Sequence, residues 1–358
     1  MYIFLAILMF SFLIFIHEFG HFFTAKLFGV QVNEFSMFMG PAIWKKQVGE
    51  TMYAIRCIPI GGYCAMEGED EDTDNPRSFQ KADWWKRLII LIAGAAMNFA
   101  AGFLIYWGLF GLTPGYETIP MPVISGFYEG NTISGENGLR VGDEISSVDG
   151  EKVYIASNIS FLLGMNLSDD PATHDLVVIR DGKEVELQNI PMEKTLVQTE
   201  NGEQLLYGMK LTAVKRTFLS GMRYAWANTL DTVRMVKLSL QMLFGGQAGI
   251  NDVGGPVMIV QTVSQAAASS GSALGAVLNV LNFCAFLGVN LAVMNLLPIP
   301  ALDGGRAVCL LLTVAYKKIT RKELDPKYEG YLHGAGMILL LGFMTLITFK
   351  DIFNIFRG

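Results

Sequence analysis

Long apolar runs separated by polar stretches dominate the pattern of this chain. Four of them are long enough to cross a bilayer as helices: the run that begins with Met1–Ile16, Leu88–Leu112, Ala273–Leu302 and Tyr331–Phe349. Leu88–Leu112 carries no charge and would form a helix of ~37 Å at the α-helical rise. Pro298 and Pro300 break the third run near its end. The pattern predicts a polytopic α-helical membrane protein with about four transmembrane helices.

A fifth apolar segment, Phe218–Phe244, differs from these four because charges recur within it. They lie opposite an apolar face when the segment is a helix. Such a helix lies on a membrane surface rather than across the membrane. We therefore expect residues 216–270 to form an amphipathic extracytoplasmic segment. Residues 1–112 should hold the first two transmembrane helices, and residues 271–358 the last two.

Residues 114–215 have the pattern of an inserted α+β module, because charges reappear and apolar residues come in short runs. Four strands and a helix are predicted, at Val123–Phe127, Glu144–Val148, Leu176–Ile179, Glu184–Leu187 and Ile155–Gly164. The module resembles the bacterial PDZ pattern in Gly138–Ile145 (GLRVGDEI) and in Val148-Asp149-Gly150. A PDZ-like fold binds an extended peptide by strand addition. The sequence leaves open whether this module docks ligands or excludes large substrates.

Charge sets the expected orientation in the membrane. Lys and Arg concentrate after the first apolar run and between the last two runs, which places both segments in the cytoplasm. The N-terminus, the PDZ-like domain and the C-terminus are then extracytoplasmic. The net charge of −6 argues against a nucleic-acid partner.

The first apolar run leads into a motif with specific chemistry, His17-Glu18-Phe19-Gly20-His21. His17 and His21 are four residues apart, so a helix presents both imidazoles to one metal ion. Glu18 lies beside that ion, where it can accept a proton from a zinc-bound water. Three ionisable groups are costly in hydrocarbon and therefore indicate a function. The motif predicts a zinc hydrolase that works in the membrane.

Catalytic zinc usually takes three protein ligands, so one more ligand is needed. His174 lies in the extracytoplasmic module and His333 begins the last run. Asp303 is the better candidate, because it follows the break at Pro298 and Pro300 in an otherwise uncharged run. Irregular backbone at membrane depth is tolerated where it lines a protein cavity. A helix end with a Gly-Gly cap is the alternative interpretation of this stretch.

Residues 30–66 follow the zinc motif and are predicted to form a membrane-associated β-hairpin. Val30 and Val32, and Tyr53, Ile55 and Cys57, alternate as residues of strands do. A transmembrane substrate hides its amides in helical hydrogen bonds, so its scissile segment must be held extended. The edge of the hairpin could pair with such a segment. An ordinary cytoplasmic loop is the alternative.

Two motifs in the correct order resemble the signatures of the site-2 protease family of intramembrane zinc metalloproteases. They are HEFGH at residues 17–21 and NLLPIPALDGG at residues 295–305. The resemblance extends to Pro59–Tyr63 and Arg87–Asn98 and is to the bacterial regulator-of-sigma-E protease type. Many of those proteases have two PDZ domains, whereas residues 114–215 have room for only one. The resemblance implies Zn²⁺ as cofactor, ligands His17, His21 and Asp303, general base Glu18, and Asn295 as the residue that holds substrate or the oxyanion.

The resemblance implies regulated intramembrane proteolysis in the cell membrane of a bacterium, with the active site near the cytoplasmic side. The expected partners are the lipid bilayer and single-span membrane proteins, such as anti-sigma factors or signal-peptide remnants. A non-catalytic scaffold that binds truncated ectodomains through its PDZ-like domain is the alternative. The complete set of zinc-site residues argues against a scaffold. The oligomeric state is not determined by the sequence.

Overall fold

The computed structural model describes twelve stretches of the chain, residues 2–69, 73–112, 118–128, 133–135, 138–165, 173–192, 194–199, 202–246, 249, 254–268, 272–322 and 326–357. The chain divides into two compact units, Met1–Ile105 with Thr232–Gly358, and Tyr106–Asp231. We call the first the helical unit and the second the module unit.

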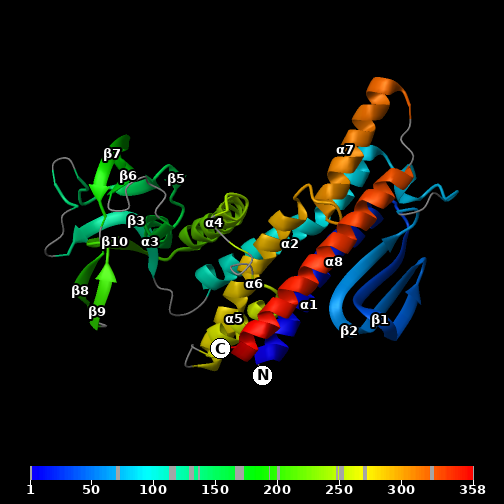
Figure 1. Ribbon diagram of the computed structural model, residues 1–358, viewed down its shortest axis with the longest axis horizontal. Helices are drawn as coiled ribbons and strands as arrows, with labels where there is room; N and C mark the ends of the chain where they lie inside the picture. The colour runs from blue at the N-terminus through cyan, green and yellow to red at the C-terminus, as the bar shows by residue number, and fades with distance from the viewer. Residues whose placement is uncertain are drawn as a thin grey trace. The chain divides into compact units, whose positions relative to one another are not determined.

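Long apolar helices form the frame of the helical unit (Figure 1). Four helices are long and apolar enough to cross a membrane: α1 (Tyr2–Leu27), α2 (Trp84–Leu112), α6 (Ala273–Asn295) and α8 (Pro326–Arg357). They correspond to the four predicted runs. The third run ends as a helix at Asn295, because Pro298 and Pro300 follow and cannot continue the hydrogen-bond ladder.

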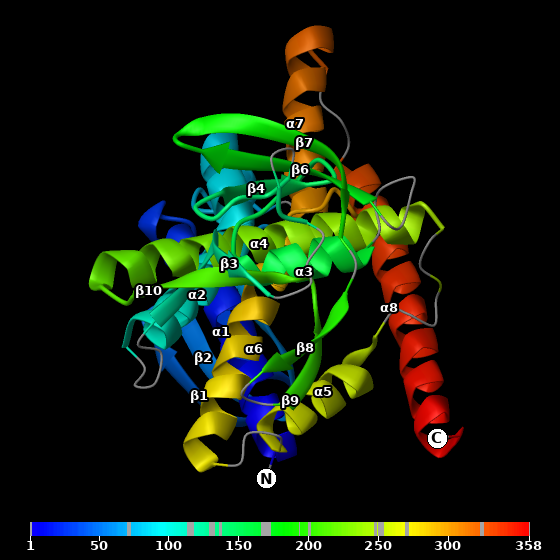
Figure 2. The ribbon, with the colours of Figure 1, turned by 90° about the vertical axis from the view of Figure 1, so that its left-hand side faces the viewer.

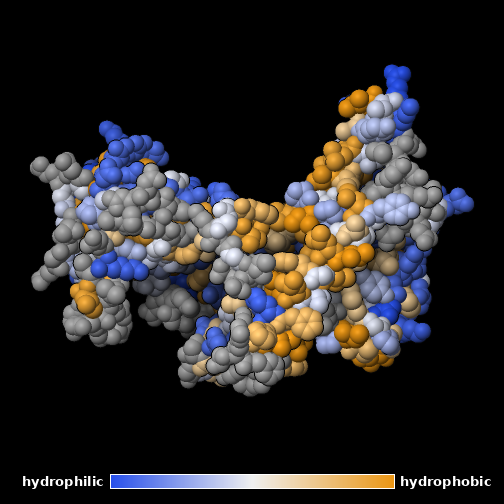
Figure 3. All heavy atoms as spheres, viewed as in Figure 1, coloured by the Kyte–Doolittle hydropathy of each residue, from blue (hydrophilic) through white to orange (hydrophobic). Residues whose placement is uncertain are grey.

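The long helices of the helical unit show a largely apolar surface on the face seen in Figure 3. On α8, the side chains of Ile338 and Leu339 are 75% and 74% exposed. An exposed apolar surface of this kind is stable only against lipid. Together with the helix lengths, it identifies a multi-pass membrane protein.

The predicted hairpin is present, as β1 (Val32–Val48) and β2 (Thr51–Met66). The chain turns at Gly49-Glu50, and the Gly40-Pro41 pair causes an irregularity within β1 rather than a turn. Residues 34–37 lie between two segments of β2, because they pair with residues 62–65 on one side and 52–55 on the other. Among the described residues, segment 62–66 pairs along one edge only. The position of the hairpin in a membrane stays a prediction.

Ion pairs hold the turn of the hairpin against the end of α1. Glu50 bonds Lys26 at 2.6 Å, and its two carboxylate oxygens lie 2.6 and 2.9 Å from the Arg77 guanidinium. The hydrogen bonds from Arg77 and Lys26 lower the pKa of Glu50 to about 2. Glu50 thus stays ionised at any physiological pH, and the hairpin keeps its place beside the helix that carries the zinc motif.

The module unit contains an antiparallel sheet, in which the strands follow one another in the order β10-β3-β4-β6-β7 (Figure 2). The strands are β3 (Thr118–Phe127), β4 (Glu144–Val148), β6 (Thr173–Arg180), β7 (Lys183–Pro191) and β10 (Met209–Lys215). β5 (Glu151–Lys152) pairs with β4, and β8 (Thr195–Thr199) pairs with β9 (Gly202–Leu206). Helix α3 (Ala156–Met165) completes a PDZ-like domain, and all four predicted strands and the predicted helix are present.

The aspartates of the two PDZ-like motifs, Asp143 and Asp149, form buried polar pairs that hold the module together. Asp143, 1% exposed, accepts hydrogen bonds from the Arg180 side chain at 2.7 and 2.8 Å. Burial raises the pKa of Asp143, but the hydrogen bonds from Arg180 and from the backbone N–H of Arg140, together with the charges of both arginines, outweigh burial, and the pKa is lowered. Asp149 in the Asp-Gly turn bonds the buried His174 at 2.6 Å. His174 therefore serves the fold of the module.

The amphipathic segment forms α4 (Phe218–Phe244), with the predicted bounds, and α5 (Pro256–Ala268). Asp351 of α8 binds the first turn of α5, since its Oδ2 accepts from the backbone N–H groups of Gly255 and Met258 at 3.0 and 3.1 Å. Asn279 of α6 donates to the Ala266 carbonyl at 2.7 Å, as expected for asparagines that hold helices together. The domain limits 1–112, 114–215, 216–270 and 271–358 stay predictions.

Candidate metal centre

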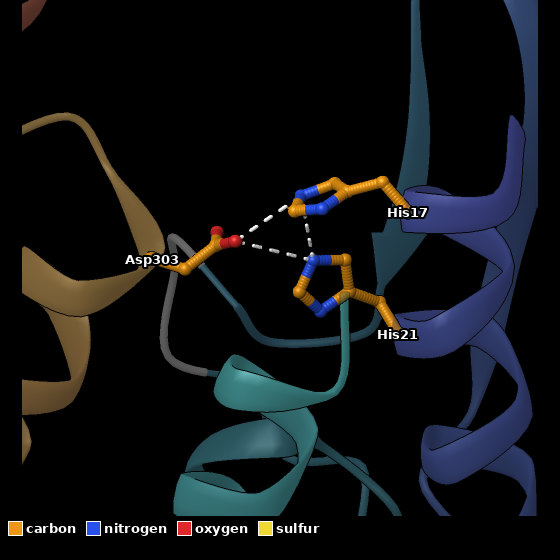
Figure 4. Close-up of side chains that lie close together, drawn as sticks. All are labelled: His17, His21 and Asp303. Atoms are coloured by element: carbon orange, nitrogen blue, oxygen red, sulfur yellow. Dashed lines mark hydrogen bonds and ion pairs between the residues drawn. The ribbon is translucent and has the colours of Figure 1, made fainter. Parts of the chain in front are cut away.

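Helix α1 places His17 and His21 one turn apart on the same face, as the helical repeat requires. Their Nε2 atoms lie 3.3 Å apart. The two rings are nearly perpendicular, with an interplanar angle of 81°, so both nitrogens can face one point without a clash. Both side chains are turned towards Asp303 in Figure 4.

Asp303 reaches this point because the connection after α6 folds back on itself, so that residues 304 and 305 lie against residues 296 and 299. Residues 296–302 form a short connection, and helix α7 (Asp303–Thr320) begins with Asp303 in its first turn. Gly304 and Gly305 permit this close approach: a Cβ on either would lie 2.3 Å from the carbonyl oxygen of Leu296 or Ile299. The two glycines therefore start a helix rather than cap one, and the alternative interpretation of this stretch is wrong.

The three side chains fit a zinc ion. Oδ2 of Asp303 lies 3.1 Å from Nε2 of His17 and 3.5 Å from Nε2 of His21. Zinc bonds of roughly 2.0–2.1 Å in a tetrahedron separate the ligand atoms by about 3.3–3.4 Å. The triangle of sides 3.1, 3.3 and 3.5 Å thus has the size of one tetrahedral face. Among the described residues, these three form the one group of ligands suited to a metal.

A backbone hydrogen bond orients His21 for metal binding. Its Nδ1 lies 2.8 Å from the carbonyl oxygen of Ile90 in α2, which can only accept. Nδ1 therefore carries the proton, and in the neutral ring Nε2 presents a lone pair towards His17 and Asp303. In a zinc-binding histidine, the ring nitrogen that does not bind the metal usually donates a hydrogen bond of this kind. Lone pairs that face one another at these distances are stable when a cation lies between them.

Glycine in α2 makes room for the two imidazoles. A Cβ on Gly94 would lie 2.4 Å from Nε2 of His21 and 2.7 Å from Cε1 of His17. On the opposite helix, a Cβ on Gly20 would lie 2.5 Å from the carbonyl oxygen of Ala93. The two helices therefore pack in direct contact where the zinc motif lies, and small residues on both make this approach possible.

Glu18 lies between the zinc motif and the hairpin. It lines a small recess together with Phe35, Ser36 and Gly62. The backbone N–H of Cys64 donates to its carboxylate. A Cβ on Gly62 would contact Cγ of Glu18 at 3.4 Å and Ile14 at 3.1 Å, so the glycine lets segment 62–66 approach α1. This places an edge of the hairpin beside the predicted general base.

Asn295 is the last residue of α6 and lies beside the histidine pair. Its Nδ2 is 3.5 Å from Nδ1 of His17, at the limit of a hydrogen bond. The structure therefore brings all five predicted site residues to one place: Glu18, His17, His21, Asn295 and Asp303.

The site also depends on residues that the sequence did not reveal. Gly94 belonged to the predicted second span, but nothing in the pattern showed that it faces the histidines. The Ile90 carbonyl has no signal in the sequence, because a backbone group is the same at every residue. The breaks at Pro298 and Pro300 were visible, whereas the contacts that shape this connection were not.

Comparison with known proteins identifies the class. The chain matches peptidase family M50 over residues 5–343, and it belongs to this family. A predicted zinc metalloprotease of Clostridium perfringens is 37% identical over 361 residues, which cover 98% of each chain. One from Fusobacterium nucleatum is 33% identical over 357 residues, 99% of each chain. Regulator of sigma-W protease RasP of Bacillus subtilis is 25% identical over 433 residues, 98% of each chain.

These matches define a zinc metalloprotease that is a multi-pass membrane protein. The predicted family, enzyme class and Zn²⁺ cofactor are confirmed. Proteins are its substrates, as for every member of a peptidase family. The roles of the individual residues, the orientation in the membrane and the identity of the substrates stay predictions.

Proposed function

We propose that the protein is an intramembrane protease that hydrolyses peptide bonds within or near the transmembrane segments of single-span membrane proteins. The convergence of His17, His21 and Asp303 inside a unit of membrane-spanning helices carries this proposal. A relative named as a regulator of a sigma factor supports anti-sigma factors as one substrate class. Signal-peptide remnants are the other class, because they too are short apolar helices.

Zinc held by His17, His21 and Asp303 would lower the pKa of a water molecule and polarise the scissile carbonyl. Glu18 then acts as the general base, accepting a proton from the attacking water. The same carboxyl group returns the proton to the leaving amine. Its position next to His17 in the chain and beside the hairpin puts it between the water and the substrate.

Asn295 stabilises the oxyanion and also orients His17. When Nε2 of His17 binds zinc, its Nδ1 carries the proton and needs an acceptor. The amide of Asn295 meets this need if its Oδ1 faces Nδ1 of His17. An amide oxygen and nitrogen are nearly equal in shape, so a half-turn exchanges them. The amide nitrogen is then available to donate to the negative oxygen that develops during attack.

Segment 62–66 of the hairpin is the proposed guide for the substrate. Along one edge, its N–H and C=O groups form no strand pairing among the described residues. An unwound substrate segment can pair there as an added strand. Because segment 62–66 contacts Glu18 through Gly62 and Cys64, such a strand would run directly past the base.

Water must reach the site from one side of the membrane. A cavity of about 340 Å³ in the helical unit is lined in part by Glu69, Arg87 and Arg306. These charges are stable only in contact with water or with one another. Arg87 lies three residues from Ile90, the hydrogen-bond partner of His21. We assign this cavity to a cytoplasmic water route.

The proposed orientation can be measured with cysteine labelling. In a Cys57→Ser background, cysteine is introduced at the exposed Glu184 of the module or at the exposed Lys318 of α7. A membrane-impermeant maleimide added to intact cells should label the cysteine at 184 and spare that at 318. Both should react after permeabilisation, which is the control. Labelling of 318 alone in intact cells would invert the topology.

Deleting residues 116–213 separates the two roles left open for the PDZ-like domain. A size filter predicts that the deletion permits cleavage of substrates with intact ectodomains. A docking site predicts that the deletion stops cleavage of truncated substrates. Cleavage of both substrate forms is measured by immunoblot, with Glu184→Gln as an exposed control on the module. Unchanged cleavage of both forms would contradict both roles.

The test of the proposed function is cleavage by purified protein in liposomes that hold a tagged single-span protein. Mass spectrometry should place the new ends inside or next to the transmembrane segment. A membrane-permeant zinc chelator should abolish the reaction, and added zinc should restore it, because the metal supplies the electrophile. Cuts confined to the soluble ectodomain would contradict intramembrane proteolysis.

A further inference from the structure

His333 of α8 is a buried histidine that takes no part in the catalytic steps above, although it lines the cavity assigned to the water route. Its side chain is 8% exposed. Its Nδ1 accepts a hydrogen bond of 3.1 Å from the backbone N–H of Ala301. Ala301 lies two residues before Asp303, in the connection that brings the carboxylate to His17 and His21. Among the described residues, His333 is not part of the metal-binding group.

The conformation of Ala301 explains why its N–H needs a fixed partner. Its φ is +78°, in the left-handed region that residues with a Cβ rarely adopt. Strained backbone of this kind persists only where the surroundings hold it. A hydrogen bond from Ala301 to α8 is one such constraint.

A second constraint comes from Gly336, nearly one turn further along α8. A Cβ on Gly336 would lie 2.4 Å from Cβ of Pro300 and 2.8 Å from its carbonyl carbon and oxygen. Helix α8 therefore packs directly against the backbone of Pro300. On the other side of the connection, Gly304 and Gly305 pack against the carbonyls of Leu296 and Ile299. The turn before Asp303 is thus held between the first turn of α7 and one face of α8.

We infer that His333 is a positioning residue for the zinc site: by accepting the Ala301 N–H, it holds the turn in the conformation that aims Asp303 at His17 and His21. The inference rests on the proposed role of Asp303 as a ligand. Without the acceptor, the part-buried N–H of Ala301 loses this hydrogen bond and the turn relaxes from its strained conformation. The carboxylate then leaves the face of the zinc tetrahedron. Loss of such an indirect support usually weakens metal affinity or activity by about 10- to 100-fold.

Three substitutions at His333 isolate the hydrogen bond. Asparagine can place Oδ1 near the position of Nδ1 and accept the same N–H, whereas alanine and leucine cannot accept. His333→Ala and His333→Leu should weaken zinc binding by about 10- to 100-fold. His333→Asn should retain the affinity of the wild type within a few-fold. The dissociation constant of zinc is measured on purified full-length protein in detergent, by competition with a chelator.

A glycine pair on α8 provides a test that leaves His333 intact. Gly336→Ala should weaken zinc binding, because its methyl group displaces Pro300. Gly334→Ala is the matched control, since a Cβ there has no neighbour within 4 Å. Both changes raise helix propensity equally, so their difference reports the contact with the turn. Thermal unfolding of the zinc-free proteins shows whether each variant is folded.

The outcomes distinguish this inference from the proposed site. If Asp303→Asn loses zinc while His333→Ala and Gly336→Ala bind it like the wild type, His333 has no positioning role. The same conclusion follows if His333→Asn is as weak as His333→Leu, because then the acceptor does not matter. If Asp303→Asn also binds zinc normally, the proposed ligand set itself is wrong. If His333→Ala does not fold, the inference is tested by comparing His333→Asn with His333→Leu and Gly336→Ala with Gly334→Ala.

Discussion

Replacing Glu18 with glutamine should lower turnover by at least ~10²-fold while zinc remains bound. Glutamine keeps the shape of the side chain and still accepts the Cys64 N–H through its amide oxygen. It cannot take a proton from the attacking water, so the step that makes the nucleophile is lost. The zinc ligands His17, His21 and Asp303 are unchanged, and the metal content should equal that of the wild type.

The measurement is the rate of cleavage of a tagged single-span substrate by purified protein, together with zinc content per chain. Glu184→Gln is the matched control. Glu184 is exposed on the module, so this substitution makes the same chemical change away from the site. Cleavage by Glu18→Gln at the wild-type rate would remove Glu18 from the mechanism. Loss of zinc along with activity would show that Glu18 supports the metal instead of the proton transfer.

Replacing Asp303 with asparagine should cost the protein both zinc and activity. The carboxylate contributes the negative charge of the ligand set, and its Oδ2 lies 3.1 and 3.5 Å from the two imidazole nitrogens. An amide oxygen is a weaker ligand for a divalent cation, because it carries no net charge. We expect the variant to release its zinc to a chelator that leaves the wild type loaded.

The exposed Asp74 provides the control, since Asp74→Asn removes a carboxylate from the helical unit without touching the site.

Gly94→Ala tests the triangle of His17, His21 and Asp303 without removing a ligand. Its methyl group would lie 2.4 Å from Nε2 of His21, so zinc should again be lost. Gly108→Ala on the same helix should have no effect, because a Cβ there has no neighbour within 4 Å. If Asp303→Asn keeps its zinc and its activity, the third ligand is another residue.

Much of this fold could be predicted from local pattern because the solvent is a bilayer. Uncharged runs of sufficient length must be helices in hydrocarbon, and α2 and α8 have the predicted places for this reason. Helix α7 was not predicted. It begins beyond the prolines and carries Lys317 and Lys318 in its last turn, so its pattern is not that of a transmembrane helix.

The candidate site, like the fold, was predictable only in part from local pattern. Helical periodicity alone put His17 and His21 on one face, since four residues make about one turn. The pairing of this motif with Asp303 rested on the need for a third ligand, on the break at Pro298 and Pro300, and on the resemblance to a family that has both motifs, rather than on geometry. No local rule gives the distance between residues separated by hundreds of positions.

The sequence by itself determined the helices of the membrane, four strands of the module and the chemistry that His17, Glu18 and His21 can perform. Each of these follows from residues that are neighbours along the chain. Only the tertiary structure decided that Gly94 makes room for the imidazoles, that Ile90 orients His21, and that α8 holds the turn before Asp303. These features are contacts between backbone and side chains of different helices. They arise from packing, in which the absence of one methyl group can matter as much as the presence of a ligand.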